Sequence, residues 1–80
     1  MNDANVRPVV VTIDDQHIPA IQSVARALEA GGLRVSNILS TVGIISGSIP
    51  LANIDALKAI PGVVDVELDQ EMHALGARDK

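Results

Sequence analysis

Residues 44–69 read IISGSIPLANIDALKAIPGVVDVELD and predict a strand, a short helix and another strand, in that order. In the stretch from Ile44 to Ile49 alternate side chains face opposite ways, a period of two that is typical of a strand. Ile45, Gly47 and Ile49 face one way, and Ile44, Ser46 and Ser48 face the other. Pro50 opens a short helix whose apolar stripe is Ile54, Leu57 and Ile60. Pro61-Gly62 breaks this helix, and Val63–Asp69 alternates apolar residues with carboxylates, which predicts the last strand.

The chain before this stretch predicts a strand, a long helix and a second strand. Arg7–Asp14 (RPVVVTID) is rich in β-branched residues and is the first strand. Asp14-Asp15-Gln16 turns the chain, and Pro19 suits the first turn of a helix. Apolar residues then recur at helical spacing, at Ile18, Ile21, Val24, Ala25 and Leu28.

Gly31-Gly32 ends this helix, because glycine reaches the left-handed conformation that closes a last helical turn. Leu33–Leu39 predicts the second strand, although its alternation slips near Asn37-Ile38. Ser40–Gly43 connects it to the strand that begins at Ile44.

The resulting order βαββαβ predicts an α+β fold, the ferredoxin-like plait, with a four-stranded antiparallel sheet and both helices on one face. The residues expected to meet the helices are Val9, Val11, Ile13, Ile45, Val64, Val66 and Leu68. The residues expected on the uncovered face are Val10, Thr12, Ile44, Ser46, Ser48, Val63, Asp65 and Glu67. This partly apolar face is a candidate contact surface. Alternatively, its β-branched residues only suit an exposed strand.

Length and composition predict one small domain with an aliphatic core. Eighty residues suffice for one domain, in which we expect an ordered core over about residues 7–70 and a fraying end over residues 76–80. The chain has no Cys, Phe, Tyr or Trp, so neither disulfides nor aromatic side chains stabilise it. A domain of this size buries only about 60% of its unfolded surface, so a partner or a second copy would add useful stability.

The charge balance disfavours nucleic acid as a partner. Ten acidic residues against six basic ones give a formal net charge of −4, with no basic stripe and no aromatic side chain on which a base could stack. Residues 1–5 lack a signal-peptide pattern, and no apolar run has the length of a membrane span. We therefore expect a cytoplasmic protein that does not contact the membrane.

No motif for catalysis or for a cofactor is present, so we expect a protein that is not an enzyme. Asp14-Asp15 pairs two carboxylates, but after a strand such a pair is typical of a turn and helix cap. Ser46-Gly47-Ser48 does not match the Gly-x-Ser-x-Gly nucleophile elbow, and Gly47 indicates a close backbone approach within the sheet. Asp69, Glu71 and His73 alternate and could converge on a metal, but a solvated strand end is favoured and no metal is expected.

The segment PGVVDVELD (61–69), running on through Met72–Leu75 (MHAL), resembles the C-terminal half of subtilisin-type propeptides. The stand-alone subtilisin inhibitors form the same family. In that family a helix ends at Pro-x-Val, and a strand of the form Val-x-x-Val-Glu-x-Asp and an extended tail follow. The match is close over Leu57–Asp69 and only topological over Arg7–Ile49. Because no protease domain follows, we expect a stand-alone inhibitor, a chaperone-like relative, or a protein that kept the fold and lost the partner.

The resemblance implies a partner and a binding mode. Members of the family lay the open face of the sheet on two surface helices of the protease. Their strand carboxylates, which match Glu67 and Asp69, cap the N-termini of those helices, where unpaired N–H groups and partial positive charge favour an anion.

The family's tail enters the protease cleft as an added strand. Mapped onto this chain, Met72, His73, Ala74 and Leu75 fill the cleft, with Leu75 immediately before the cleavage point. Alternatively, Met72 and Leu75 only cover the end of the sheet. Residues 76–80 would have to be trimmed or lie along the leaving side of the cleft.

Two other interpretations stay open. Val11–Asp14, the following helix, Gly31-Gly32 and Val35–Ile38 also resemble ACT domains, which are regulatory βαββαβ modules that bind amino acids. The turn that holds the ligand in ACT domains usually contains Gly near its end, whereas this chain has Asp14–Pro19 without Gly. The third interpretation is a self-associating scaffold, a homo-oligomer that buries Val10, Ile44 and Val63 of the open face.

Overall fold

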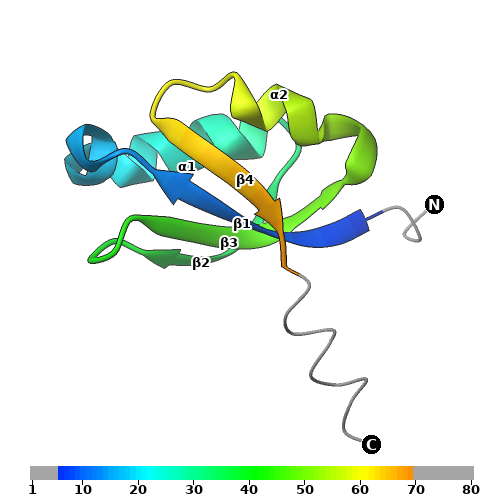
Figure 1. Cartoon of the computed structure of the whole chain (residues 1–80), viewed down its shortest axis with the longest axis horizontal. Coiled ribbons are helices and arrows are strands. Elements are labelled where there is room, and N and C mark those ends of the chain that lie inside the picture. The colour runs from blue at the N-terminus through cyan, green and yellow to red at the C-terminus, as the bar shows by residue number, and fades with distance from the viewer. Residues whose placement is uncertain (1–5, 70–80) are drawn as a thin grey trace, which may run out of the picture.

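The computed structural model describes residues 6–69, and these form the predicted βαββαβ order. Figure 1 shows the elements, and two 3₁₀-helices precede the α-helices. In chain order they are β1 (Val6–Ile13), a 3₁₀-helix (Asp15–Ala20), α1 (Ile21–Ala30), β2 (Arg34–Leu39), β3 (Ile44–Pro50), a 3₁₀-helix (Leu51–Asn53), α2 (Ile54–Lys58) and β4 (Val63–Leu68).

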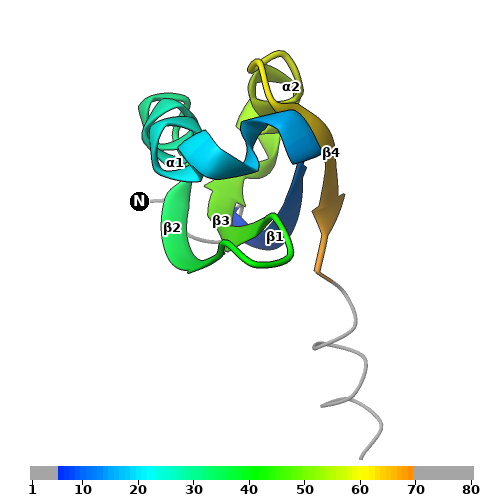
Figure 2. The same cartoon turned by 90° about the vertical axis from the view of Figure 1, so that its left-hand side faces the viewer.

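The strands form one antiparallel sheet in the order β2-β3-β1-β4. Figure 2 shows α1 and α2 together on one side of this sheet, and within residues 6–69 no helix lies over the other side. This arrangement is the ferredoxin-like plait, so the predicted fold class is confirmed. The first strand of the chain lies in the middle of the sheet, between β3 and β4.

The core lies between the sheet and the helices and is entirely aliphatic. Among residues 6–69 no polar or charged side chain is buried. The buried side chains are Val9, Val11, Ile13, Ile21, Val24, Ala25, Leu28, Leu33, Ile45, Ile49, Leu57 and Val66. Ile18, Val35, Ile38, Ile54, Ile60 and Val63 pack around them. Burial of an aliphatic side chain of this size contributes about 1.5–3 kcal/mol, so this layer carries the stability of the domain.

The long helix begins later than the sequence predicts. Asp14 caps the first 3₁₀-helix, its side chain accepting a hydrogen bond from the Gln16 N–H at 2.9 Å. Pro19 lies inside this 3₁₀-helix and not in the first turn of α1, which starts at Ile21. The apolar stripe of α1 is buried as predicted, and Gly32, with φ 109°, follows its end.

The second helical segment also begins with a 3₁₀ turn. Pro50 is the last residue of β3 and precedes this turn instead of opening α2. The predicted apolar stripe is confirmed: Leu57 is fully buried, and Ile54 and Ile60 are half-buried against the core.

At Gly47 the backbone of β2 lies too close to β3 for a side chain to fit. A Cβ at this position would collide with the Arg34 carbonyl oxygen and would lie 3.0 Å from the Arg34 carbonyl carbon. The pairing of β2 with β3 also shifts register between Val35 and Asn37, so Ser36 has no partner in β3. The predicted close approach at Gly47 is therefore confirmed, and the slip in the alternation of β2 is a bulge.

The predicted orientations of two β4 residues, Val63 and Val64, are wrong, and a bulge explains both; Leu68 lies on the predicted side but is less buried than expected. Ile13 pairs with Val63 and Thr12 with Asp65, so Val64 is an extra residue. Val63 therefore packs against the core, whereas Val64 is 63% exposed. Leu68 pairs with Val9 but is 39% exposed, because it is the last residue of an edge strand. Of the three β4 residues expected to meet the helices, only Val66 is buried.

Candidate functional site

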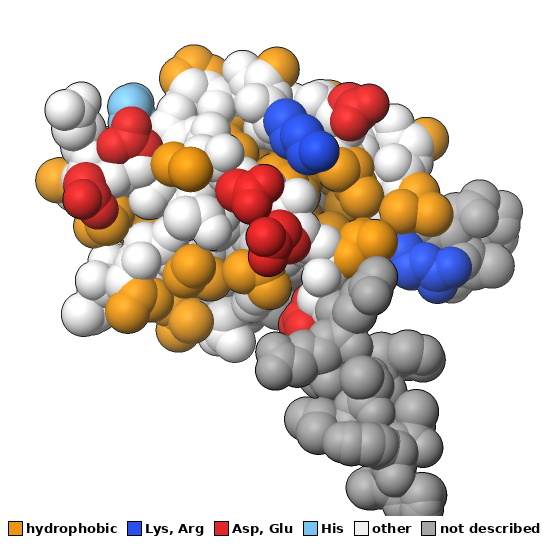
Figure 3. Space-filling view, viewed as in Figure 1, with side chains coloured by type: hydrophobic (Ala, Val, Ile, Leu, Met, Phe, Trp, Pro, Cys, Tyr) orange, Lys and Arg blue, Asp and Glu red, His pale blue; other side chains and the backbone are white. Residues whose placement is uncertain are grey.

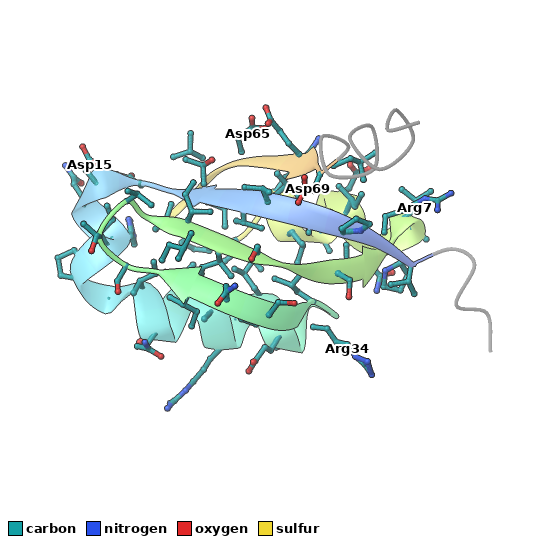
Figure 4. All side chains as sticks on the ribbon, turned by 90° about the horizontal axis from the view of Figure 1, so that it is seen from below. Arg7, Asp15, Arg34, Asp65 and Asp69 are labelled. Atoms are coloured by element: carbon teal, nitrogen blue, oxygen red, sulfur yellow. The ribbon has the colours of Figure 1, made fainter. Side chains whose placement is uncertain are left out.

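The side of the sheet without helices is the candidate site, and we call it the open face. It presents the side chains that alternate with the buried ones, and Figure 4 views it directly. Its two central rows are Val6, Pro8, Val10 and Thr12 on β1 and Ile44, Ser46, Ser48 and Pro50 on β3. Most of these side chains are half-buried by their neighbours in the sheet.

An acidic row runs along β4 at one border of the open face. Asp65 pairs with Thr12 and Glu67 with Val10, so both carboxylates lie on this side of the sheet. Asp69 follows two residues after Glu67, and its N–H donates to the Pro8 carbonyl at 2.9 Å. We refer to Asp65, Glu67 and Asp69 as the acidic row; Figure 3 shows acidic side chains gathered over β4.

Two carboxylates of the acidic row have no partner within residues 6–69. Asp65 Oδ1 accepts the Val66 N–H at 2.9 Å, so that carboxylate is engaged by its own strand. Neither Glu67 nor Asp69 takes part in a side-chain hydrogen bond or ion pair in the described part of the chain. Glu67 is exposed and Asp69 half-buried. The structure therefore brings the predicted binding carboxylates together on the open face.

Pro8 determines where the acidic row leaves the sheet. The Asp69 N–H donates to the Pro8 carbonyl. In an antiparallel pair of this kind, a second hydrogen bond normally runs from the N–H of the opposite residue, here Pro8, to the Asp69 carbonyl. Proline has no N–H, so this bond cannot form, and β4 ends at Leu68. The other predicted binding residues, Met72, His73, Ala74 and Leu75, lie outside the described residues.

The opposite corner of the open face is apolar. Leu39 pairs with Ile44 at the β2–β3 hairpin, and Val42 lies in the turn between these strands. Leu39 is 49% and Val42 62% exposed. We call Leu39, Val42 and Ile44 the hairpin patch; Figure 3 shows hydrophobic side chains gathered over this hairpin. Sequence reasoning missed Leu39 and Val42 as surface residues, although an apolar residue inside a turn is a signal that points to such a surface.

Both edges of the sheet are protected against pairing with another strand. Because Asp69 turns its N–H toward β1, alternation turns the Val66 N–H toward the free edge of β4. At this free edge the Asp65 carboxylate accepts the hydrogen bond from the Val66 N–H. The edge strand β2 is interrupted by the bulge at Ser36. Carboxylates and bulges on edge strands block the addition of another chain, so the face is the more accessible surface for a partner.

Within residues 6–69 the other candidate groups of the sequence do not form a reactive site; Glu71 and His73 lie outside the described residues. Asp14 caps the helical turn, as predicted, and its Oδ2 lies 3.7 Å from His17 Nδ1. Ser46 and Ser48 lie in the middle of β3 and not at a strand-to-helix turn. Within residues 6–69 no three His, Cys, Asp or Glu side chains are grouped as metal ligands. Among the helices of the same residues, none is long and apolar enough to cross a membrane.

The chain was compared with models of protein families, with curated proteins and with solved structures, and none of them matches.

Proposed function

We propose that this chain is a non-catalytic binding module that docks on a subtilisin-type serine protease and blocks its cleft. The open face and residues Met72–Leu75 form the contact. The observation that carries the proposal is the pair Glu67 and Asp69, two carboxylates on one face of the sheet that have no partner within residues 6–69. A carboxylate without an internal partner is available to donors of another molecule.

The chemistry of the pair suits the N-terminus of a helix in the partner. The first four N–H groups of a helix have no partner within it, and they carry partial positive charge. Each carboxylate placed there contributes about 0.3–1 kcal/mol, and more when the contact is partly buried. Glu67 and Asp69 are two residues apart along an extended chain, about 7 Å, so they reach two neighbouring helix ends.

The centre of the open face suits a protein surface. Val10, Thr12 and Ser46 lie next to each other on β1 and β3, are half-buried and carry no charge. The charges stand at the border, in the acidic row. An uncharged centre with a polar rim is the usual composition of a protein interface. The protected edges of the sheet favour this face over strand pairing.

Inhibition in this proposal comes from occupation of the cleft and not from a catalytic group of this chain. The segment Met72–Leu75 follows the acidic row after two further residues, Gln70 and Glu71, so docking of the row brings it to the protease. It then adds to the enzyme as an extended strand, with Leu75 at the cleavage point and Met72 three residues before it.

The test is inhibition of a subtilisin by the purified chain, with mass spectrometry of the mixture. We expect inhibition, and any slow cleavage between Leu75 and Gly76. The double variant Glu67→Gln/Asp69→Asn should weaken inhibition by about tenfold, since about 1.4 kcal/mol of contact energy is lost. The matched control Asp15→Asn/Asp55→Asn removes the same charge from exposed helical positions and should inhibit like the original chain.

A chain that ends at residue 71 separates the two parts of the contact. It should keep its fold and lose inhibition. Rapid degradation of the full chain without inhibition, or full inhibition by the double variant, would show that the proposed docking mode is wrong.

The hairpin patch favours a second candidate function, self-association. Leu39 and Val42 expose apolar surface together with Ile44, and burial of such surface stabilises a small domain. Size-exclusion chromatography with light scattering tests this candidate. A dimer that Val42→Ser converts to a monomer would support it, and a monomer at high protein concentration would exclude it.

A further inference from the structure

A pocket lies at the end of the sheet at which β1 and β2 begin and β3 ends. Val6, Gly32, Arg34, Ser48 and Pro50 line it, and its volume is about 480 Å³. Binding sites for small molecules usually have volumes of about 300–1,000 Å³. The strand register explains the arrangement, since Arg34 pairs with Ser48 and Val6 with Pro50.

The lining combines one positive charge with a hydroxyl group and apolar walls. Among residues 6–69 Arg34 is the only charged residue that lines the pocket, and no carboxylate in this part of the chain forms an ion pair with it. Ser48 supplies a hydroxyl on the neighbouring strand, and Val6 and Pro50 supply the apolar walls. Figure 4 shows that Arg34 and Arg7 lie toward the same end of the molecule.

We propose that this pocket binds a small carboxylate with a short aliphatic body. A guanidinium group presents paired N–H donors that match the two oxygens of a carboxylate, and the Ser48 hydroxyl can donate to the same group. The aliphatic body contacts Val6 and Pro50. Among residues 6–69 no anionic side chain lines the pocket, so the ammonium group of an amino acid would lose its hydration there without a counter-ion from this part of the chain. The pocket therefore selects a simple carboxylate over an α-amino acid of the same shape.

The pocket lies at one end of the open face, away from the acidic row. Arg34 belongs to β2, at one edge of the sheet, and the acidic row belongs to β4 and its end, at the other edge. Val6, Ser48 and Pro50 also belong to the open face, so a protease that covered the whole face would compete with the carboxylate. The titrations below use the chain without a protease, so their outcome does not depend on the proposed docking.

Three probes that share one carbon skeleton test the proposal by titration of the ¹H–¹⁵N spectrum of the full chain. They are 4-methylpentanoate, its neutral amide 4-methylpentanamide, and leucine. We expect 4-methylpentanoate to shift the amide signals of Val6, Gly32, Arg34 and Ser48 with a dissociation constant on the order of 1 mM, which is typical of so small a ligand. The amide and leucine should bind at least tenfold more weakly.

Two arginine variants distinguish the pocket from a general attraction to positive charge. Arg34→Gln should weaken binding of 4-methylpentanoate about tenfold or more, the loss expected for a charge-assisted hydrogen bond. Arg7→Gln removes the same charge from the same end, but Arg7 does not line the pocket, and its effect should stay within about twofold. Unchanged melting temperatures would show that both variants remain folded.

Several results would overturn the proposal. The first is equal shifts of the amide signals with all three probes. The second is an equal loss of affinity for 4-methylpentanoate in the two arginine variants. The third is no shift of these amide signals at a probe concentration of about ten times the expected dissociation constant.

Discussion

The two faces of the sheet differ in what their side chains do, although they belong to the same strands. Along β3, Ile45, Gly47 and Ile49 are buried under the helices, whereas Ile44, Ser46 and Ser48 are half-buried on the open face. The helix-covered side contains only aliphatic residues, and the open face mixes apolar, hydroxyl and acidic groups. The comparison suggests that one face supplies stability, so that the other is free to vary for binding.

The largest expected difference between the faces is at neighbouring isoleucines of β3. Ile45→Ala should lower the free energy of unfolding by about 2–5 kcal/mol, because Ile45 is fully buried and its loss leaves a cavity. Ile44→Ala should cost about 1 kcal/mol, since Ile44 is half-buried and water can fill the space. Urea denaturation followed by circular dichroism measures both. Equal losses of unfolding free energy in the two variants would contradict the division of roles between the faces.

The next largest effect on stability is expected at Gly47, where β2 and β3 lie close together. Gly47→Ala should destabilise the domain by about 1–3 kcal/mol, because the added methyl group collides with the Arg34 carbonyl. Gly76→Ala, a change that lies outside the described residues, is the control for the loss of glycine itself. Thermal unfolding checks the difference, and a fully stable Gly47→Ala variant would contradict the close contact between β2 and β3.

A smaller effect on stability is expected from the carboxylates that the proposed partner contacts. Glu67→Gln/Asp69→Asn should change the free energy of unfolding by no more than about 0.5 kcal/mol, since these side chains have no partner within residues 6–69. Urea denaturation of the double variant tests this. A loss of unfolding free energy above about 2 kcal/mol would show that these carboxylates stabilise the folded domain and are not free for a partner.

The last prediction concerns association of the protein through the free edge of β4. Asp65→Asn keeps an oxygen that can accept the Val66 N–H, whereas Asp65→Ala leaves this N–H free. Only the alanine variant should associate more strongly through β4 as its concentration rises, with a stability loss of about 1 kcal/mol or less. Analytical ultracentrifugation compares the two variants, and identical association would mean that the carboxylate does not protect the edge.

The fold could be predicted because periodicity and chain breaks agree along the sequence. Strict alternation in Ile44–Ile49 and the helical stripe from Ile21 to Leu28 place most of the buried core correctly. The errors lie where a single residue interrupts a period. The extra residue Val64 reverses the expected orientations at the start of β4, those of Val63 and Val64. Such a bulge depends on pairing with a distant strand, so it cannot be predicted from the periodicity of one segment.

The candidate site could be predicted only in part. The orientation of Glu67 follows from alternation after the bulge, and the structure places Glu67 where the sequence predicts it. The pocket at Arg34 brings together residues from Val6 to Pro50 and could not be predicted, because it depends on the order and register of three strands. The role of Pro8 depends in the same way on Asp69, a residue far along the chain.

The central place of β1 has a consequence for synthesis on the ribosome. Both neighbours of β1 come from the second half of the chain, Ile44–Pro50 and Val63–Leu68. Val9 and Val11 therefore have no strand to pair with while some thirty further residues are added, roughly 2–6 s at the usual rates of translation. During this interval the central strand has no partner in the native sheet, so the sheet can form only after β3 has been synthesised.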